Sequence, residues 1–299
     1  MNPTGGPMAM THPTPFAIPR RVGSYRARAV VNTIMTGLCG AAVVFALLPL
    51  FSVLWLVVSK GIGSLSLAFF TSLPKPVGEV GGGVGNAIVG TLYMVGLASL
   101  IGLPLGIGAG IFLAERGDGK LGQTVRFTAE VLAGVPSIVI GVVAYGLIVL
   151  PMHHFSALAG AVALAILMIP TLARGTEEMI RLVPPTLREA SLALGVPAWK
   201  TSLSVVLRTA LAGLINAALL AIARAAGETA PLLFTALNNQ YWNLHPMQPT
   251  ASLTVQIFNY AISPYDDWHA QAWGAALCLL ILIGLLSLTA RVVTARRRS

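Results

Sequence analysis

The sequence predicts an all-α integral membrane protein of six transmembrane helices with both termini in the cytoplasm. Three observations predict this fold class. The chain is 56% hydrophobic and only 10% charged, with a mean hydropathy of +0.80, whereas a soluble domain carries about 25% charged residues. Long runs of the chain contain no charge at all. The basic residues that remain gather on one side of the predicted membrane.

The charge-free runs are long enough to cross a bilayer, which takes about 20 apolar helical residues per crossing. They lie between Arg28 and Lys60, Glu79 and Glu115, Glu130 and Arg174, and Asp267 and Arg291. The third run is long enough for two crossings. A further span begins after Arg208 and is interrupted by Arg224 and Glu228. We therefore expect helices at about 29–58, 86–114, 127–150, 156–173 and 270–290, and a fifth span after residue 208.

The positions of Lys and Arg set the orientation of the six spans. If the spans alternate, the 19 basic residues divide into 16 on the side of the termini, two (Lys60 and Lys75) on the other side, and Arg224 inside a span. Basic residues are enriched in cytoplasmic loops, so the termini are predicted to be cytoplasmic. The basic charge thus orients the chain among membrane lipids, and we do not expect a nucleic-acid partner despite a pI near 10.2.

The chain divides into a transmembrane domain and two tails. Residues 1–28, with five prolines in the first 19 positions, are predicted to form a disordered basic cytoplasmic tail. Residues 29–290 form the six-helix domain, with a cytoplasmic loop at about 174–208, and residues 291–299 form a second basic tail. Gly102, Gly106 and Gly110 make a smooth helix stripe that a neighbouring backbone can approach closely. Pro136 is expected to kink the third helix.

Residues able to carry bond chemistry are scarce. Cys39 and Cys278 both lie in apolar spans, and we expect no disulfide framework from them. His153 and His154 are adjacent and have no Cys or carboxylate nearby in sequence, so they predict a polar turn rather than a metal site. Gly119-Lys120 lacks the earlier glycine of a phosphate-binding P-loop. We therefore predict no catalytic residue, metal or ATPase site in this chain.

The cytoplasmic loop contains a predicted helix-turn-helix. Pro184 and Pro185 suit the start of a helix, and residues 186–194 place Leu187, Ala190 and Leu194 on one face. Gly195 suits the left-handed position after a helix end. Periodicity alone would favour a helix lying on lipid headgroups.

The order of residues favours a partner protein instead. Glu189-Ala190-Ser191, then Gly195, then Val205-Val206-Leu207 resembles the EAA loop of ABC importer permeases. The resemblance implies a type I ABC-importer architecture. It also implies a coupling helix in which Glu189, Ala190, Ser191 and Gly195 contact a separate ATPase that hydrolyses ATP with Mg²⁺. One departure is Arg208, which stands where these permeases usually have proline, so we expect a straighter helix joint.

Arg224 and Glu228 lie deep in the fifth span. A charge at the bilayer centre costs about 2.5–3.5 kcal/mol on insertion scales, and the spacing of four places both side chains on one helix face. A structural ion pair between Arg224 and Glu228 would explain why the two charges are present despite this cost. A substrate pathway would also explain it, because intramembrane ionisable groups usually line one, and the planar guanidinium matches the oxygens of phosphate.

Four segments resemble phosphate-importer permeases, in the PstA-like rather than the PstC-like form. They are ARAAGETAPLL (223–233), GVPSIVIG (134–141), TEEMIRLVP (176–184) and NAIVGT (86–91). The resemblance implies a phosphate pathway through Arg224, Glu228 and Thr229 in a multi-pass subunit of the bacterial inner membrane. It implies as partners a PstC-like permease subunit, two PstB-like ATPase subunits and an extracytoplasmic PstS-like phosphate-binding protein.

Other functions remain open at this point. The same architecture could carry molybdate or sulfate, because the Arg-Glu face suits a tetrahedral anion generally. A proton-coupled secondary transporter could use Glu228 but would not need the EAA loop. An intramembrane enzyme would need a catalytic pair or metal ligands, for which Arg224 and Glu228 are the available residues.

Overall fold

The computed structural model describes residues 23–76, 78–79 and 81–296, and its regular elements are all helices. The chain divides into two compact units, residues 1–54 and 55–299. The first unit holds most of helix α1 (Gly23–Gly61). This helix is apolar on all sides, as is typical of a helix surrounded by lipid or by other helices. Residues 1–22 of the predicted tail lie outside the described residues, and α1 already begins at Gly23.

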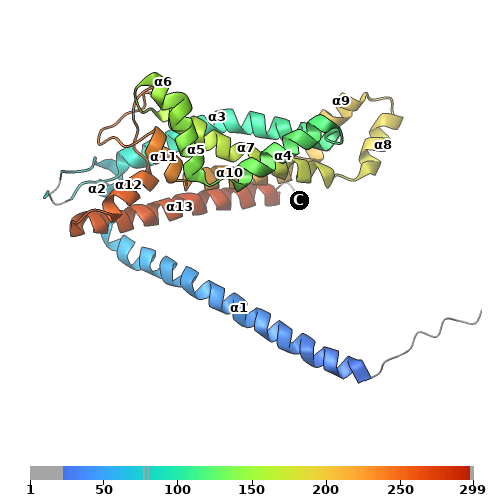
Figure 1. Ribbon diagram of the computed structural model, residues 1–299, viewed down its shortest axis with the longest axis horizontal. Coiled ribbons are helices and arrows are strands. Elements are labelled where there is room, and N and C mark those ends of the chain that lie inside the picture. Colours follow the sequence, from blue (N-terminus) through green and yellow to red (C-terminus); the bar gives the residue numbers. More distant parts are fainter. Residues whose placement is uncertain (1–22, 77, 80, 297–299) are drawn as a thin grey trace, which may run out of the picture. The chain divides into compact units, whose positions relative to one another are not determined.

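The second unit is built on four long helices that pack side by side (Figure 1). They are α3 (Gly85–Arg116), α7 (Ala157–Arg181), α10 (Leu207–Ala226) and α13 (Asp266–Arg296). The interior between them is lined by side chains such as Met94, Leu164, Met168 and Leu172. α13 continues through most of the predicted C-terminal tail. Together with α1, five described helices are long and apolar enough to cross a membrane.

α3 and α7 approach closely along the predicted glycine stripe. A Cβ atom on Gly106 would lie 2.5 Å from the Cβ of Leu172, and one on Gly110 would lie 2.6 Å from the carbonyl oxygen of Ala173. Gly108, on another face of α3, has no such neighbour within 4 Å. The prediction of close packing is confirmed, and a larger side chain at Gly106 would push the two helices apart.

The remaining span is broken rather than kinked. α4 (Lys120–Gly134) and the segment 137–152 are bent by 104°. The second half consists of α5 (Ser137–Ala144), the π-helical turn η2 (Tyr145–Val149) and α6 (Leu150–Met152). Pro136 forces Val135 into an extended conformation (ψ 131°) and cannot donate a helical hydrogen bond. The expected single helix at 127–150 is therefore wrong. With this pair as one span, the number of spans is the six predicted.

Short elements occupy the two ends of the second unit (Figure 1). At one end lie α8 (Pro185–Ala193), α9 (Ala198–Thr201) and the π-helical turn η3 (Ser202–Val206). At the other lie the 3₁₀ turn η1 (Ile62–Ser64), α2 (Leu67–Thr71), α11 (Ala230–Thr235) and α12 (Leu253–Ala261). α12 was not predicted from the sequence.

The start of α3 holds the segment between α11 and α12 in place. Asn86 Nδ2 donates to the carbonyl oxygen of Asn239 at 2.7 Å, and the hydroxyl of Thr91 accepts from the N–H of Leu253 at 2.8 Å. Gly90 lies against the backbone of Ala251. The NAIVGT segment is therefore an anchor for the loops at this end of the molecule.

Candidate functional site

Arg224 and Glu228 lie at the end of a helix rather than within one. α10 ends at Ala226 and Gly227 caps it, while Pro231 opens the short helix α11. The expected helix continuing past Arg224 is therefore wrong. Pro231 has no N–H to bond the carbonyl of Gly227 four residues earlier, and its ring clashes with that carbonyl. The two charges still face each other, with Arg224 Nε 3.7 Å from Glu228 Oε1. The break leaves Glu228 outside the helix, where its carbonyl oxygen accepts from the hydroxyl of Thr254 at 2.9 Å.

The pair is loose enough to receive an anion. A separation of 3.7 Å is too long for a hydrogen bond, and the Arg224 side chain is 60% exposed whereas that of Glu228 is 17% exposed. The guanidinium can therefore present its planar donors to a ligand. The nearby carboxylate limits how strongly an anion would be held.

Arg224 and Glu228 line a cavity of about 170 Å³ beside the break between α4 and α5. The cavity also contains Ser137 and Thr171, which supply hydroxyl groups, and the remaining lining residues are Leu132, Ala133, Val135, Pro136 and Leu167. The first turn of α5 borders the cavity. N–H groups in the first turn of a helix have no partner within the helix and favour anions. The site therefore combines a guanidinium, hydroxyls and a helix start.

The break has a role in forming this cavity. A Cβ atom on Gly141 would lie 2.7 Å from the Cα of Pro231, so α5 packs directly on α11. Two segments far apart in the sequence, 134–141 and 223–233, thus meet at one site. Thr229, predicted to line the pathway, caps the start of α11, where its carbonyl oxygen accepts from the N–H of Leu232 at 3.1 Å. It is not among the residues lining the cavity.

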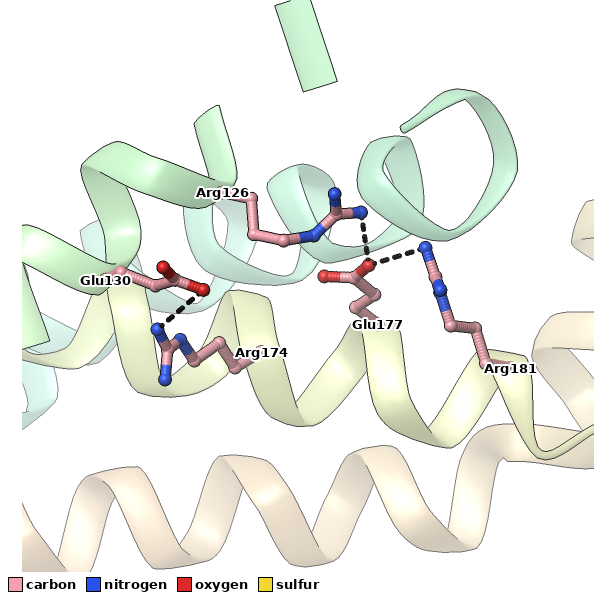
Figure 2. Close-up of polar contacts among 5 residues, drawn as sticks. All are labelled: Arg126, Glu130, Arg174, Glu177 and Arg181. Atoms are coloured by element: carbon pink, nitrogen blue, oxygen red, sulfur yellow. Dashed lines mark hydrogen bonds and ion pairs between the residues drawn. The ribbon is translucent and has the colours of Figure 1, made fainter. Parts of the chain in front are cut away.

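Ion pairs between α4 and α7 continue from the cavity along the two helices. Figure 2 shows Arg126 and Glu130 of α4 facing Arg174, Glu177 and Arg181 of α7. Glu177 Oε1 lies 2.7 Å from Arg126 Nη2 and 2.9 Å from Arg181 Nη2, and Arg174 Nη2 lies 3.2 Å from Glu130 Oε1. The Glu177 side chain is only 10% exposed. These contacts clamp the first half of the broken span to α7.

The predicted helix-turn-helix is present, and its turn has the expected geometry. α8 begins at Pro185, and Gly195 adopts a left-handed conformation with φ of +77°. The N–H of Gly195 donates to the carbonyl of Leu192 at 2.9 Å, and the N–H of Val196 donates to that of Ser191 at 3.3 Å. These two bonds form a Schellman motif. The prediction for Gly195 is confirmed.

The residues predicted to contact an ATPase divide between an exposed and an internal face. Glu189 and Ala190 are exposed, and so are the apolar side chains of Leu187, Leu194 and Trp199. Ser191 is buried, and its hydroxyl lies 2.8 Å from that of Thr201. An exposed apolar helix face with a fixed turn is suited to lie in a groove of a partner protein.

The helix joint after this turn agrees with the expectation of a straighter joint, because Ala198–Ala226 is one unbroken helical span. The π-helical turn η3 stands between α9 and α10, directly before Leu207 and Arg208. π-helical turns are rare and often mark functional joints.

Known proteins resemble this chain over nearly its whole length. Residues 106–299 match the family of binding-protein-dependent transport system inner membrane components. The phosphate transport system permease protein PstA of Yersinia pestis is 44% identical over 268 residues, covering 89% of this chain and 91% of the relative. PstA 1 of Mycobacterium tuberculosis (strain H37Rv) is 38% identical over 282 residues, covering 91% of each. The chain belongs to this family of inner-membrane permeases.

Solved structures show the fold of the permease. The inward-facing MetNI methionine ABC transporter matches with a TM-score of 0.59 at 22% identity, over 70% of this chain and 94% of that one. An amino acid ABC transporter matches with a TM-score of 0.55 at 20% identity, over 70% of this chain and 92% of that one. The permease therefore has the type I ABC-importer fold. Its family membership makes it a transport subunit.

The polar contacts that hold the permease together were not predicted from the sequence. From the sequence, Arg126, Arg174, Arg181 and Arg188 served only as indicators of topology. In the structure, Arg188 Nη1 lies 2.7 Å from Glu115 Oε1 at the end of α3. The spacing of four between Glu177 and Arg181 was a local signal of one pair. Pairs between helices, such as Arg126 with Glu177, leave no such signal.

His153 and His154 do not form a ligand set with acidic or sulfur side chains. His153 adopts a left-handed conformation (φ 57°) at the end of α6, and His154 Nδ1 lies 3.3 Å from the carbonyl oxygen of Phe155. In the described part of the chain, no three His, Cys, Asp or Glu side chains are grouped as a metal ion would require.

Proposed function

We propose that this permease is the PstA-type subunit of an ATP-driven phosphate importer. The observation that carries the proposal is the cavity at Arg224, whose polar lining suits a tetrahedral anion. The names of the relatives, phosphate transport system permease proteins, support phosphate as that anion. Molybdate or sulfate would use the same guanidinium, and the relatives favour neither.

The permease would act as the passive path of the importer. Phosphate would enter the cavity beside the α4–α5 break, bind Arg224 and be released past the ion pairs of Figure 2. Transport requires binding strong enough to admit the ion and weak enough to release it. Glu228, 3.7 Å from Arg224, would provide this weakening by competing for the guanidinium.

Partner subunits would supply the energy and the substrate. The exposed face of α8 would dock into an ATPase that binds ATP and Mg²⁺, and two such ATPase subunits would serve one importer. A PstC-like permease would form the other half of the pathway. A phosphate-binding protein would deliver substrate to the end that carries α11 and α12.

Uptake of labelled phosphate tests the substrate. In cells lacking other phosphate importers, we expect the complete complex to restore phosphate uptake, because the pathway is built for this anion. A large excess of sulfate or molybdate should leave the uptake rate unchanged. Displacement of phosphate by either anion would favour the other oxyanion. Uptake that continued after inactivation of the ATPase would favour a proton-coupled transporter.

The orientation of the permease is open to a direct chemical test. Leu194 on the turn after α8 and Tyr241 before α12 are both highly exposed, at 85% and 72%. In a chain whose Cys39 and Cys278 are replaced by serine, we expect an impermeant thiol reagent to label Tyr241→Cys in intact cells. Leu194→Cys, expressed without the ATPase that would cover it, should react only after the cells are opened, because the basic loops face the cytoplasm. The reverse pattern would overturn the proposed topology.

A further inference from the structure

The helix-turn-helix formed by residues 185–201, the coupling unit, is rigid but has little apolar attachment to the bundle. The Schellman motif fixes its turn, and the Ser191–Thr201 contact at 2.8 Å ties α8 to α9. Ser191 is the buried residue of α8. The apolar residues Leu187, Leu192 and Leu194 are exposed. The connection from α8 to the membrane helices must therefore be largely polar.

One carboxylate makes that connection from α3. Glu115 Oε1 lies 2.7 Å from Arg188 Nη1 of α8, and Glu115 Oε2 accepts a hydrogen bond of 2.9 Å from the hydroxyl of Ser202. The two oxygens therefore reach two different elements, the coupling helix and the first residue of η3. The Glu115 side chain is 22% exposed, and its Oε1 atom is shielded from solvent. The contact with Arg188 is an ion pair without hydrogen-bond geometry, because Oε1 has no hydrogen-bond partner among the described residues. It therefore acts through Coulombic attraction, and the bond from Ser202 to Oε2 is the directional contact.

We propose that Glu115 is a positioning residue through which movement of the coupling unit, driven by ATP, reaches the membrane helices. This inference rests on the proposed function as an ATP-driven importer. Glu115 lies in the last turn of α3, where the helix dipole disfavours a negative charge. Arg188 provides the opposite charge that stabilises it there. Loss of either charge would leave the other poorly compensated and would loosen α8 from α3.

The surroundings of Glu115 suit a joint between moving parts. Ser202 begins the π-helical turn η3, so the same carboxylate holds α8 and the start of the joint that leads into α10. At the other end of α3, Asn86 and Thr91 hold the segment that leads into α12. α3 is one continuous helix packed tightly on α7 through its glycines. A shift at Glu115 would therefore be carried along α3 to the loops at the opposite end.

Purified complexes test this role with isosteric and charge-exchanged variants. Glu115→Gln and Arg188→Gln remove one charge each, and the double variant Glu115→Arg with Arg188→Glu restores a pair in reverse. Two readouts are the stimulation of ATP hydrolysis by phosphate-loaded binding protein and the ATP-dependent change in thiol labelling at Tyr241→Cys. We expect both single variants to retain the ATPase on purification but to lose about tenfold in both responses. The charge-exchanged variant should recover most of each response.

Glu79→Gln is the matched control. Glu79 pairs with Lys75 at 3.8 Å, and both side chains are about half exposed, so this pair should contribute little. Normal responses in Glu115→Gln and Arg188→Gln would overturn the inference, as would failure of the charge exchange to restore either response. If thiol labelling of the wild-type complex changes with ATP but phosphate-loaded binding protein does not stimulate ATP hydrolysis, only the phosphate assignment is contradicted. If the wild-type complex shows neither response, both proposals are contradicted.

Discussion

Replacement of Arg224 by lysine is expected to reduce phosphate uptake about 10- to 100-fold, because charge-assisted hydrogen bonds contribute about 1.5–3 kcal/mol. Lysine keeps the charge but loses the planar fork that binds two oxygens of one anion. The side chain is 60% exposed at the cavity, so the substitution should not disturb packing. Uptake of labelled phosphate, divided by the amount of permease in the membrane, measures the effect.

A control on the same helix separates the cavity from the rest of α10. Arg208 lies near the start of α10 and is exposed, so Arg208→Lys makes the same chemical change away from the cavity. We expect its uptake to be normal. Equal phosphate uptake in Arg224→Lys and Arg208→Lys would show that Arg224 does not bind phosphate in the transport pathway.

The double variant Arg224→Gln with Glu228→Gln distinguishes a pathway from a structural ion pair. If the pair only stabilises the fold, removing both charges leaves neither charge unpaired. The amount of permease in the membrane and the phosphate uptake should then both equal those of the wild type. If Arg224 binds the anion, the amount of permease in the membrane should be normal and phosphate uptake should be absent. The loose 3.7 Å contact favours the second result.

The sequence allowed the fold and the coupling turn to be predicted because their signals are local. Charge-free runs of sufficient length predict membrane helices wherever they occur, and the described helices follow them. The left-handed conformation of Gly195 was predicted from its place directly after a helix end, and its φ of +77° confirms it. In both cases the physical cause lies within a few residues of the feature.

The cavity could be predicted only in part, because its walls come from distant segments. Arg224 and Glu228 were apparent as charges in an apolar run, and the structure places both in the cavity lining. Ser137 borders it just after the 104° bend at Pro136, and Thr171 comes from α7. Pro136 predicted a distortion of the helix at that position. The size of the bend could not be predicted, because it depends on packing between distant segments, such as that of Gly141 on Pro231. Glu115 and Arg188 are 73 positions apart (188 − 115), and no local pattern connects them.

Replacement of Gly195 by valine is expected to abolish phosphate uptake while the permease remains in the membrane. A β-branched residue in the left-handed region is strained by roughly 1–3 kcal/mol, and the Schellman turn between α8 and α9 depends on that conformation. The coupling unit would then lose the fixed angle that presents Glu189 and the exposed apolar face to the ATPase. Retention of the ATPase on purification measures docking, and uptake measures coupling.

Gly119→Val isolates the backbone effect from that of added bulk. A Cβ atom added to either Gly119 or Gly195 would meet no other atom within 4 Å, but Gly119 has a φ of −84°, which any residue adopts. The two substitutions therefore differ mainly in backbone strain. We expect the Gly119→Val permease to keep the partner ATPase bound on purification and to take up phosphate normally. Loss of function in both variants would point to a general disturbance of the end that carries α8 and α9. Normal docking and uptake in Gly195→Val would show that the left-handed turn is not needed, and the coupling role assigned to this helix-turn-helix would fail.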